Sequence, residues 1–388
     1  MAGTSTLRLN QHTVLFTGFI TLVPGLPIQA QSPVPVERLQ RPTASFSSPF
    51  SHLSGLRELS DGRLVVVDRI EAEVGLIDLR AGTARQVGRP GSGPGEYTRP
   101  FTIYAAPNDS TRVLDLGGRR LLTLDGSGRF HDAILRLPTV RGGFKPPLGI
   151  DSQGRVYLDL EGILVTATQA AAERGAAPVY RWSPGGQIDS LTEIRFPPVR
   201  AGPGGDYSGP VPPYQPRDAW AVDASGRVAV VRQTPYRVEW IIPGRTGPLM
   251  GPVVSAPHIR IGRAEREAYI DQLMQEGGFT VLRDGQGGVV RPPRPNPGDL
   301  QWPETLPIFE GPAWISPSGE VWVRRHRAAT TRSPLFDLFD GAGRLVRQVE
   351  LPADRRLVGL GNGTVYAVRV DDDGLQWLER YALAAPRE

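Results

Sequence analysis

Short apolar runs separated by turn residues follow one another along most of this chain. The unit between residues 60 and 100 shows the pattern most clearly, with apolar runs over 64–67, 74–77 and 85–87. A loop rich in Gly and Pro, from 89 to 100, ends the unit. Runs this short, with turn residues at about every tenth position, are typical of antiparallel strands.

A tight turn followed by an apolar strand occurs six times. The turn positions are Gly62, Asp109, Gly154, Gly226, Gly319 and Gly363. They are separated by 47, 45, 72, 93 and 44 residues. A period of about 45 residues fits one four-stranded blade, so the two long spacings indicate insertions. Six blades around an axis predict an all-β protein with the fold of a six-bladed β-propeller.

The repeat also predicts the blade boundaries. We expect blades over 51–90, 100–138, 147–198, 217–257, 310–352 and 355–383. The last of these has no room for a fourth strand, so we expect the N-terminal segment 34–46 to supply it and close the ring. The alternative is a flexible linker. Apolar residues at helical spacing predict a short helix over 263–276, within the insertion 258–310, either as a lid or as packing for the loop.

The first thirty residues resemble a secretory signal. Arg8 precedes an apolar stretch over 13–23, and cleavage after Ala30 would leave residues 31–388 as a single propeller domain. We therefore expect an exported protein, periplasmic or extracellular, with no membrane span in the mature chain. An uncleaved anchor is the alternative. The absence of Cys excludes disulfides and thiolate metal sites, and a net charge of +4 is too small to indicate nucleic-acid binding.

The first unit resembles an NHL repeat, whose pattern places an Asp before the third strand and ends in a Gly-rich loop closed by Pro. Here Asp68 and Asp78 stand ten residues apart, and the Gly-rich segment 91–97 precedes Pro100. The later units depart from the pattern, and Glu71 occupies its Asn position. The resemblance implies a six-bladed propeller; it does not imply one activity, because this fold carries both binding modules and enzymes.

All of the extra sequence is predicted to lie on one face of the propeller. Strands of a blade alternate in direction, so second-to-third connections and blade-to-blade connections open on the same side. The insertions at 160–178, 197–216 and 257–311 are connections of these two kinds. Binding residues are often carried by loops on a rigid scaffold, so this face is the candidate site. The alternative is that the insertions have no function and persist because loop tips tolerate added residues.

The residue that ends the second strand changes character around the ring. It is acidic in the first three units and basic in the last three: Asp68, Asp115, Asp159, Arg232, Arg324 and Arg369. Such a rim would orient a polar or anionic ligand, because Arg side chains bind carboxylates and phosphates through paired donors. These six residues are the candidate ligand-binding residues. Structural ion pairs or solvated turn residues are the alternative.

No catalytic or metal-binding pattern stands out. The four histidines after residue 30 fall at unlike places in their units, and the acidic run 371–373 lacks the spacing of a Ca²⁺ loop. We therefore expect a binding module without catalysis, cofactor or metal, acting as a monomer on an unknown protein or a small polar or anionic ligand. The alternatives are a lactonase- or lyase-like enzyme with an axial metal, and a structural adaptor in an envelope complex.

Overall fold

The computed structural model describes residues 34–137, 145–159, 173–198, 212–275, 282–283, 289–290 and 294–385. The expected signal peptide, most of the predicted insertion at 160–178 and most of the 197–216 connection lie outside these ranges. In the described part, no helix is long and apolar enough to cross a membrane.

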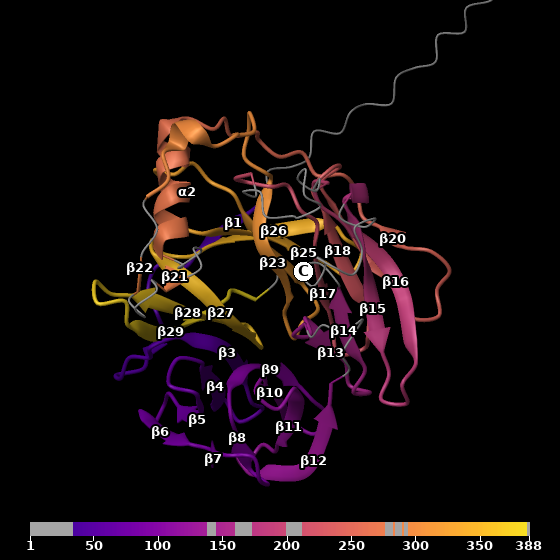
Figure 1. Cartoon of the computed structure of the whole chain (residues 1–388), viewed down its shortest axis with the longest axis vertical. Coiled ribbons are helices and arrows are strands. Elements are labelled where there is room, and N and C mark those ends of the chain that lie inside the picture. Colours follow the sequence, from indigo (N-terminus) through magenta and orange to yellow (C-terminus); the bar gives the residue numbers. More distant parts are fainter. Residues whose placement is uncertain are drawn as a thin grey trace, which may run out of the picture. The chain divides into compact units, whose positions relative to one another are not determined.

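Six antiparallel sheets follow one another along residues 34–385 and form a six-bladed β-propeller, as predicted (Figure 1). The innermost strands are β3 (Leu53–Glu58), β9 (Pro100–Ala105), β13 (Gly149–Ile150), β17 (Ala219–Val222), β23 (Phe309–Ile315) and β27 (Arg355–Gly361). The second strands are β4 (Leu64–Asp68), β10 (Thr111–Asp115), β14 (Val156–Asp159), β18 (Val228–Arg232), β24 (Val321–Arg325) and β28 (Thr364–Val370). The third strands are β5 (Glu73–Asp78), β11 (Arg120–Leu124), β15 (Ala176–Trp182), β19 (Arg237–Ile241), β25 (Leu335–Phe339) and β29 (Gln376–Ala382). The outer strands are β6 (Thr83–Gln86), β12 (Phe130–Arg136), β16 (Ile188–Arg195), β20 (Leu249–Met250), β26 (Leu345–Glu350) and, in the sixth blade, β2 (Ala44–Ser45).

The hydrophobic core lies between adjacent blades, and the second strands are buried on both faces. In β4, Val65 and Val67 pack in a cluster with residues of the second blade, whereas Leu64 and Val66 pack with residues of the sixth. Alternate side chains of a strand point to opposite faces, so a blade covered on both sides needs an uninterrupted apolar run. This explains why the repeat is most visible at the second strands.

The first hairpin of every blade turns through left-handed backbone, as the sequence predicts. In the first blade, Gly62 has φ of +86°, a value that a residue with a side chain rarely adopts. The second blade has no Gly here, and Asn108 and Asp109 take φ values of +57° and +56° instead. Asn and Asp tolerate this region better than other non-Gly residues, so the second hairpin turns through left-handed backbone without Gly, using two such residues where the first blade uses one.

The N-terminal segment closes the ring. Ala44 and Ser45 pair antiparallel with Arg380 and Glu379, so β2 supplies the fourth strand of the last blade, as predicted. The structure adds one strand that the repeat does not predict. β1 (Val36–Arg38) pairs parallel with β26 and makes the fifth blade five-stranded. The segment from 36 to 46 therefore joins two blades.

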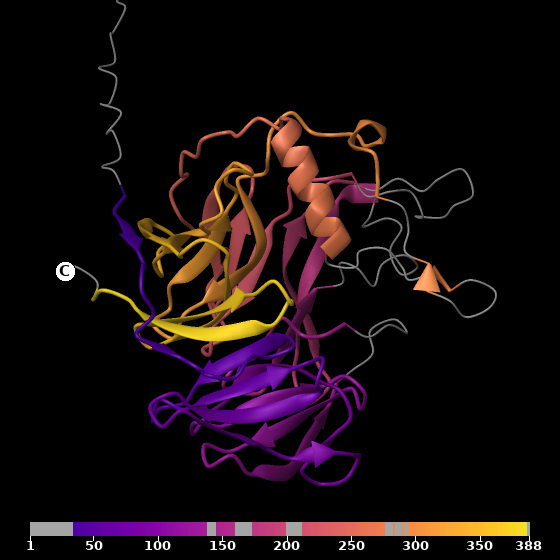
Figure 2. The ribbon, with the colours of Figure 1, turned by 90° about the vertical axis from the view of Figure 1, so that its left-hand side faces the viewer.

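The long insertion after the fourth blade carries the predicted helix, α2 (Arg263–Gln275), followed by the short pair β21 (Leu282–Arg283) and β22 (Val289–Val290) and the single turn η1 (Pro297–Asp299). Figures 1 and 2 both show α2 beside the fifth blade. Ile270 of α2 is fully buried, and Tyr214 donates a hydrogen bond to the carbonyl oxygen of Glu265 in the same helix at 2.7 Å.

Replacing Phe46 by Ala tests the closure of the ring. The Phe46 side chain is buried against Leu53 and Tyr366, between the first and last blades. Losing a buried aromatic ring leaves a cavity and costs about 3 kcal/mol of the free energy of unfolding. Denaturant unfolding of Phe46→Ala and of the exposed control Ser48→Ala measures this. Equal unfolding midpoints for the two variants would contradict closure by this segment.

Candidate functional site

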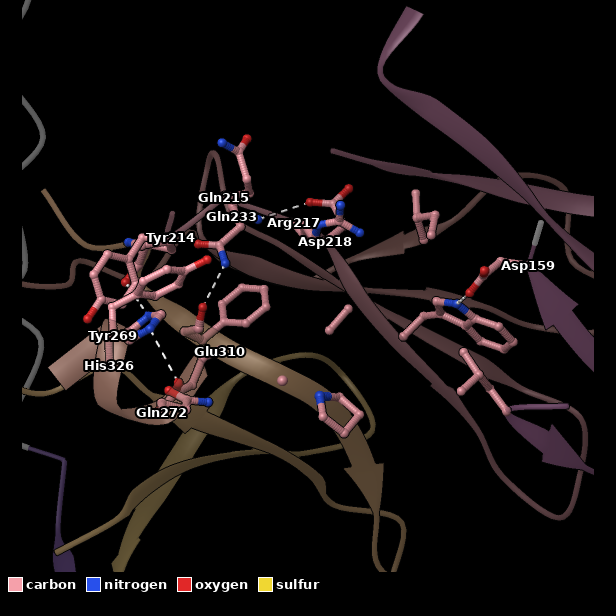
Figure 3. Close-up of a pocket in the computed structure, with 18 of the residues that line it drawn as sticks. Asp159, Tyr214, Gln215, Arg217, Asp218, Gln233, Tyr269, Gln272, Glu310 and His326 are labelled. Carbon is pink, nitrogen blue, oxygen red and sulfur yellow. Dashed lines mark hydrogen bonds and ion pairs between the residues drawn. The ribbon is translucent and has the colours of Figure 1, made fainter. Parts of the chain in front are cut away.

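A cavity of 450 Å³ lies where the inner strands of the third, fourth and fifth blades begin. Its walls include the start of β17 at 218–220 and of β23 at 309–312. The connection before β17 contributes Tyr214 and Gln215, and α2 contributes Tyr269 and Gln272 (Figure 3). Leu273 of α2 also lines the cavity. The described parts of the two long blade-to-blade connections therefore meet at this cavity.

One end of the cavity is charged and lies between the third and fourth blades. The buried Asp159 carboxylate accepts a hydrogen bond from the Trp220 indole Nε1 at 2.7 Å and forms an ion pair with Lys145. Arg217 also lines this end. Burial lowers the pKa of the Arg217 guanidinium, and the attraction of Asp159 opposes that shift. Side chains of both charges therefore line this end of the cavity.

The middle of the cavity is held by a buried ion network. Arg232 donates to Asp218 at 2.7 Å and to Glu239 at 2.8 Å, and its side chain is only 8% exposed. Burial disfavours the charge of Arg232, but its two carboxylate partners raise its pKa above the usual value. Gln233 donates to the Phe309 carbonyl oxygen and accepts from the Ile308 N–H, each at 3.0 Å. These contacts join the fourth blade to the fifth.

The other end of the cavity is aromatic. The Tyr214 ring lies 5.0 Å from that of Tyr269 and 5.7 Å from the imidazole of His326, the second pair meeting edge to face. Trp302 extends the cluster, with its ring 5.6 Å from that of Tyr269. Offset and edge-to-face pairs are favourable aromatic contacts, so the cluster fixes α2 against the fifth blade.

His326 is the histidine that reaches the cavity, and its ring is held on both sides. Nδ1 lies 2.9 Å from the Pro307 carbonyl oxygen, and Nε2 lies 3.4 Å from Oε2 of Glu310. Oε1 of Glu310 lies 3.1 Å from Nε of Arg324. Burial lowers the pKa of His326, and the carboxylate of Glu310 opposes the shift.

The six predicted rim residues do not come together. Asp159 lines the cavity, and Arg324 lines a smaller one of 160 Å³ beside it. Arg232 is engaged by Asp218 and Glu239 beneath the cavity wall. Arg369 is 41% exposed and lies over the Trp377 ring.

Asp68 and Asp115 hold the connections that lead into their own blades. Asp68 accepts backbone N–H bonds from Ser51 at 2.7 Å and His52 at 3.1 Å. Asp115 accepts from the Arg99 N–H at 2.8 Å and pairs with Arg120 at 2.9 Å. A role of these two carboxylates in ligand binding stays a prediction, which their structural contacts do not favour.

Sequence reasoning did not single out Glu310, His326, Tyr214 or Tyr269. The signal that it lacked is strand register. Glu310 on β23 is directly opposite Arg324 on β24, and His326 follows the end of β24. Without the register, His326 could be placed only within its repeat unit, where it matched no other histidine.

A second large cavity lies at the opposite ends of the inner strands. It has a volume of 1130 Å³ and is lined by all six blades, for example by 56–58 of β3, 102–105 of β9 and 359–361 of β27. Among the residues that the structure describes, no group of three or more His, Asp or Glu side chains could hold a metal ion.

No protein-family model and no curated protein sequence matches this chain. Similar solved structures include the calcium-binding protein regucalcin of Agrobacterium tumefaciens, at 10% identity and a TM-score of 0.38, over 91% of this chain and 99% of that one. A DUF4221 family member of Bacteroides vulgatus has 9% identity and a TM-score of 0.47, over 89% and 95%. A gluconolactonase of Xanthomonas campestris has 11% identity and a TM-score of 0.41, over 89% and 94%. At these identities and TM-scores, no activity or ligand is transferred to this chain, and the resemblance to NHL repeats is not confirmed.

Replacing Arg232 by Ala separates a structural role from a binding role. Arg232→Ala leaves the buried carboxylates of Asp218 and Glu239 without their partner, which costs about 3 kcal/mol of the free energy of unfolding. Arg369→Ala removes an exposed side chain and changes that free energy by less than about 0.5 kcal/mol. Denaturant unfolding of both variants measures the difference. An Arg232→Ala protein as stable as Arg369→Ala would contradict the structural role.

Proposed function

We propose that this protein is an exported binding module that takes a small polar ligand into the cavity between α2 and the third to fifth blades. The observation that carries the proposal is the cavity itself. Its 450 Å³ lies within the range of about 300–1,000 Å³ that is typical of small-molecule sites. A cavity of this kind favours a small molecule over a protein surface.

The lining supports a polar ligand with some apolar surface. Asp159 stands at one end and the rings of Tyr214 and Tyr269 stand at the other (Figure 3). Lys145 pairs with Asp159, so side chains of both charges line the first end. Amide side chains of Gln215 and Gln272 lie near the aromatic end and offer both donors and acceptors. A ligand that carries polar groups on a carbon framework complements these surfaces, because each polar group meets a partner as it leaves water.

The scaffold supports binding by a cavity that is formed before the ligand arrives. The Arg232 network fixes β17 and β18, and Gln233 joins them to the start of β23. A preformed site loses little conformational entropy when its ligand binds. Export is supported by the charge and apolar pattern of the first thirty residues.

Filling the cavity from the helix tests this function. Gln272 is exposed on α2 and lines the cavity, so the indole of Gln272→Trp would occupy ligand space without disturbing the core. We expect at least about tenfold weaker binding, since one lost polar contact and a steric clash each cost on the order of 1 kcal/mol. The probes are small polar compounds found to bind the wild-type protein by ligand-observed NMR, with affinities from isothermal titration calorimetry.

Ala264→Trp is the matched control, because Ala264 is exposed on the same helix and outside the cavity wall. Its affinity for the same compounds should equal that of the wild type. Equal affinities for all three proteins would place binding elsewhere and overturn the proposal.

A further inference from the structure

Three side chains of the fifth blade contact one another at the cavity, with Glu310 as the shared partner of Arg324 and His326. Arg324 and Glu310 face each other across β24 and β23, with Arg324 Nε 3.1 Å from Glu310 Oε1. The second carboxylate oxygen, Oε2, lies 3.4 Å from His326 Nε2. Glu310 and His326 line both the 450 Å³ cavity and the smaller one beside it.

The contact of Nδ1 with Pro307 indicates which ring nitrogen of His326 carries the proton, and the backbone of Phe309 also favours the protonated ring. The Pro307 carbonyl oxygen accepts hydrogen bonds and cannot donate, so Nδ1, at 2.9 Å, must carry a hydrogen. In the neutral imidazole, Nε2 then has a lone pair and is an acceptor. Glu310 Oε2 is an acceptor as well. Two acceptors 3.4 Å apart repel each other unless a hydrogen-bond donor is shared between them.

The charged and titratable groups around the ring come from four elements. They are Glu310 on β23, Arg324 on β24, Tyr214 on the connection before β17, and Glu265 on α2, which lines the smaller cavity with His326. Burial lowers the pKa of His326 despite the attraction of Glu310, which favours the neutral ring at neutral pH. Burial likewise raises the pKa of Tyr214, so its hydroxyl stays protonated and donates to the Glu265 carbonyl oxygen.

We propose that His326 Nε2 and Glu310 Oε2 form a recognition pair for a hydroxyl or amine group of the ligand, and that a proton competes with the ligand for this pair. The inference deepens the proposed function and rests on it. When the ring is neutral, an O–H or N–H group of the ligand donates to one or both acceptors. When the ring is protonated, Nε2–H donates to Glu310 and the acceptor pair is no longer available.

The first part of the test is a titration of His326 by NMR, using the full chain with isotope-labelled histidine and His326→Gln to assign the ring signals. In the wild type, the ring nitrogen shifts should show hydrogen on Nδ1 and a lone pair on Nε2 above the midpoint. Glu310→Gln removes a nearby negative charge that favours the protonated ring, so it should lower the midpoint by about one pH unit. Glu320→Gln, on the hairpin between β23 and β24, is the matched control and should leave the midpoint unchanged. A midpoint that Glu310→Gln does not move would overturn the proposal.

The second part uses three small probes at two pH values, about two units above and about two units below the His326 midpoint that the first part measures. Ethylene glycol and ethanolamine carry O–H and N–H donors, whereas 1,2-dimethoxyethane has the same framework as ethylene glycol without donors. We expect one or both donor probes to shift the His326 ring signals at the higher pH, with at least about fivefold smaller shifts at the lower pH and in Glu310→Gln. Both donor probes carry a hydroxyl, so a response to ethylene glycol indicates a hydroxyl ligand, whereas a response to ethanolamine alone indicates an amine.

The indole N–H of Trp220, at the other end of the cavity, reports occupancy independently of His326. Equal shifts with dimethoxyethane, or shifts of His326 that do not depend on pH, would overturn the recognition pair. A Trp220 signal that responds while His326 does not would overturn the pair and leave the proposed function standing. If neither the His326 signal nor the Trp220 signal responds to any probe, both the recognition pair and the proposed function are contradicted.

Discussion

Burial of the second strand of each blade on both faces is the constraint on which the rest of this structure depends. Val65 and Val67 of β4 face one neighbouring blade, and Leu64 and Val66 face the other. The backbone at the strand end must then find polar partners where two blades and a loop meet. Asp68 meets this need by accepting N–H bonds from the connection before its blade, and Asp115 does the same in the next blade. Arg232 takes the same strand position in the fourth blade, with two buried carboxylates as its partners.

The fold could be predicted because the repeat records this constraint. Turn residues with left-handed backbone and continuous apolar runs are local signals, and they placed six blades and the closing strand. The parallel pairing of β1 with β26 could not be predicted in this way. It joins Val36 to Gln348, and the three residues of β1 carry no alternation of apolar and polar positions that would mark them as a strand.

For the candidate site, the sequence predicted only which face of the propeller carries it. Its cavity forms where the third to fifth blades depart from the repeat, and its walls combine β17, β23, α2 and the connection before β17. The predicted change from Asp to Arg at the second-strand ends holds only in the first four blades, because β24 and β28 end one residue after Arg324 and Arg369. Where it holds, these side chains serve mainly the packing of blade connections. Of those six residues, Asp159 lines the cavity, because its partner Trp220 belongs to the next blade. The pairing of Glu310 with His326 depends on register and on the path of 307–310, which no local pattern encodes.

The central claim is that ligands enter the cavity between α2 and the third to fifth blades. Mapping backbone amide shifts over a library of small polar compounds tests it most directly, because the map compares both cavities of the ring in one measurement. The account predicts shifts at 214–215, 218–220 and 269–273, around the 450 Å³ cavity. Shifts gathered instead at 60–62, 223–225 and 316–319, around the cavity at the opposite ends of the inner strands, would contradict it.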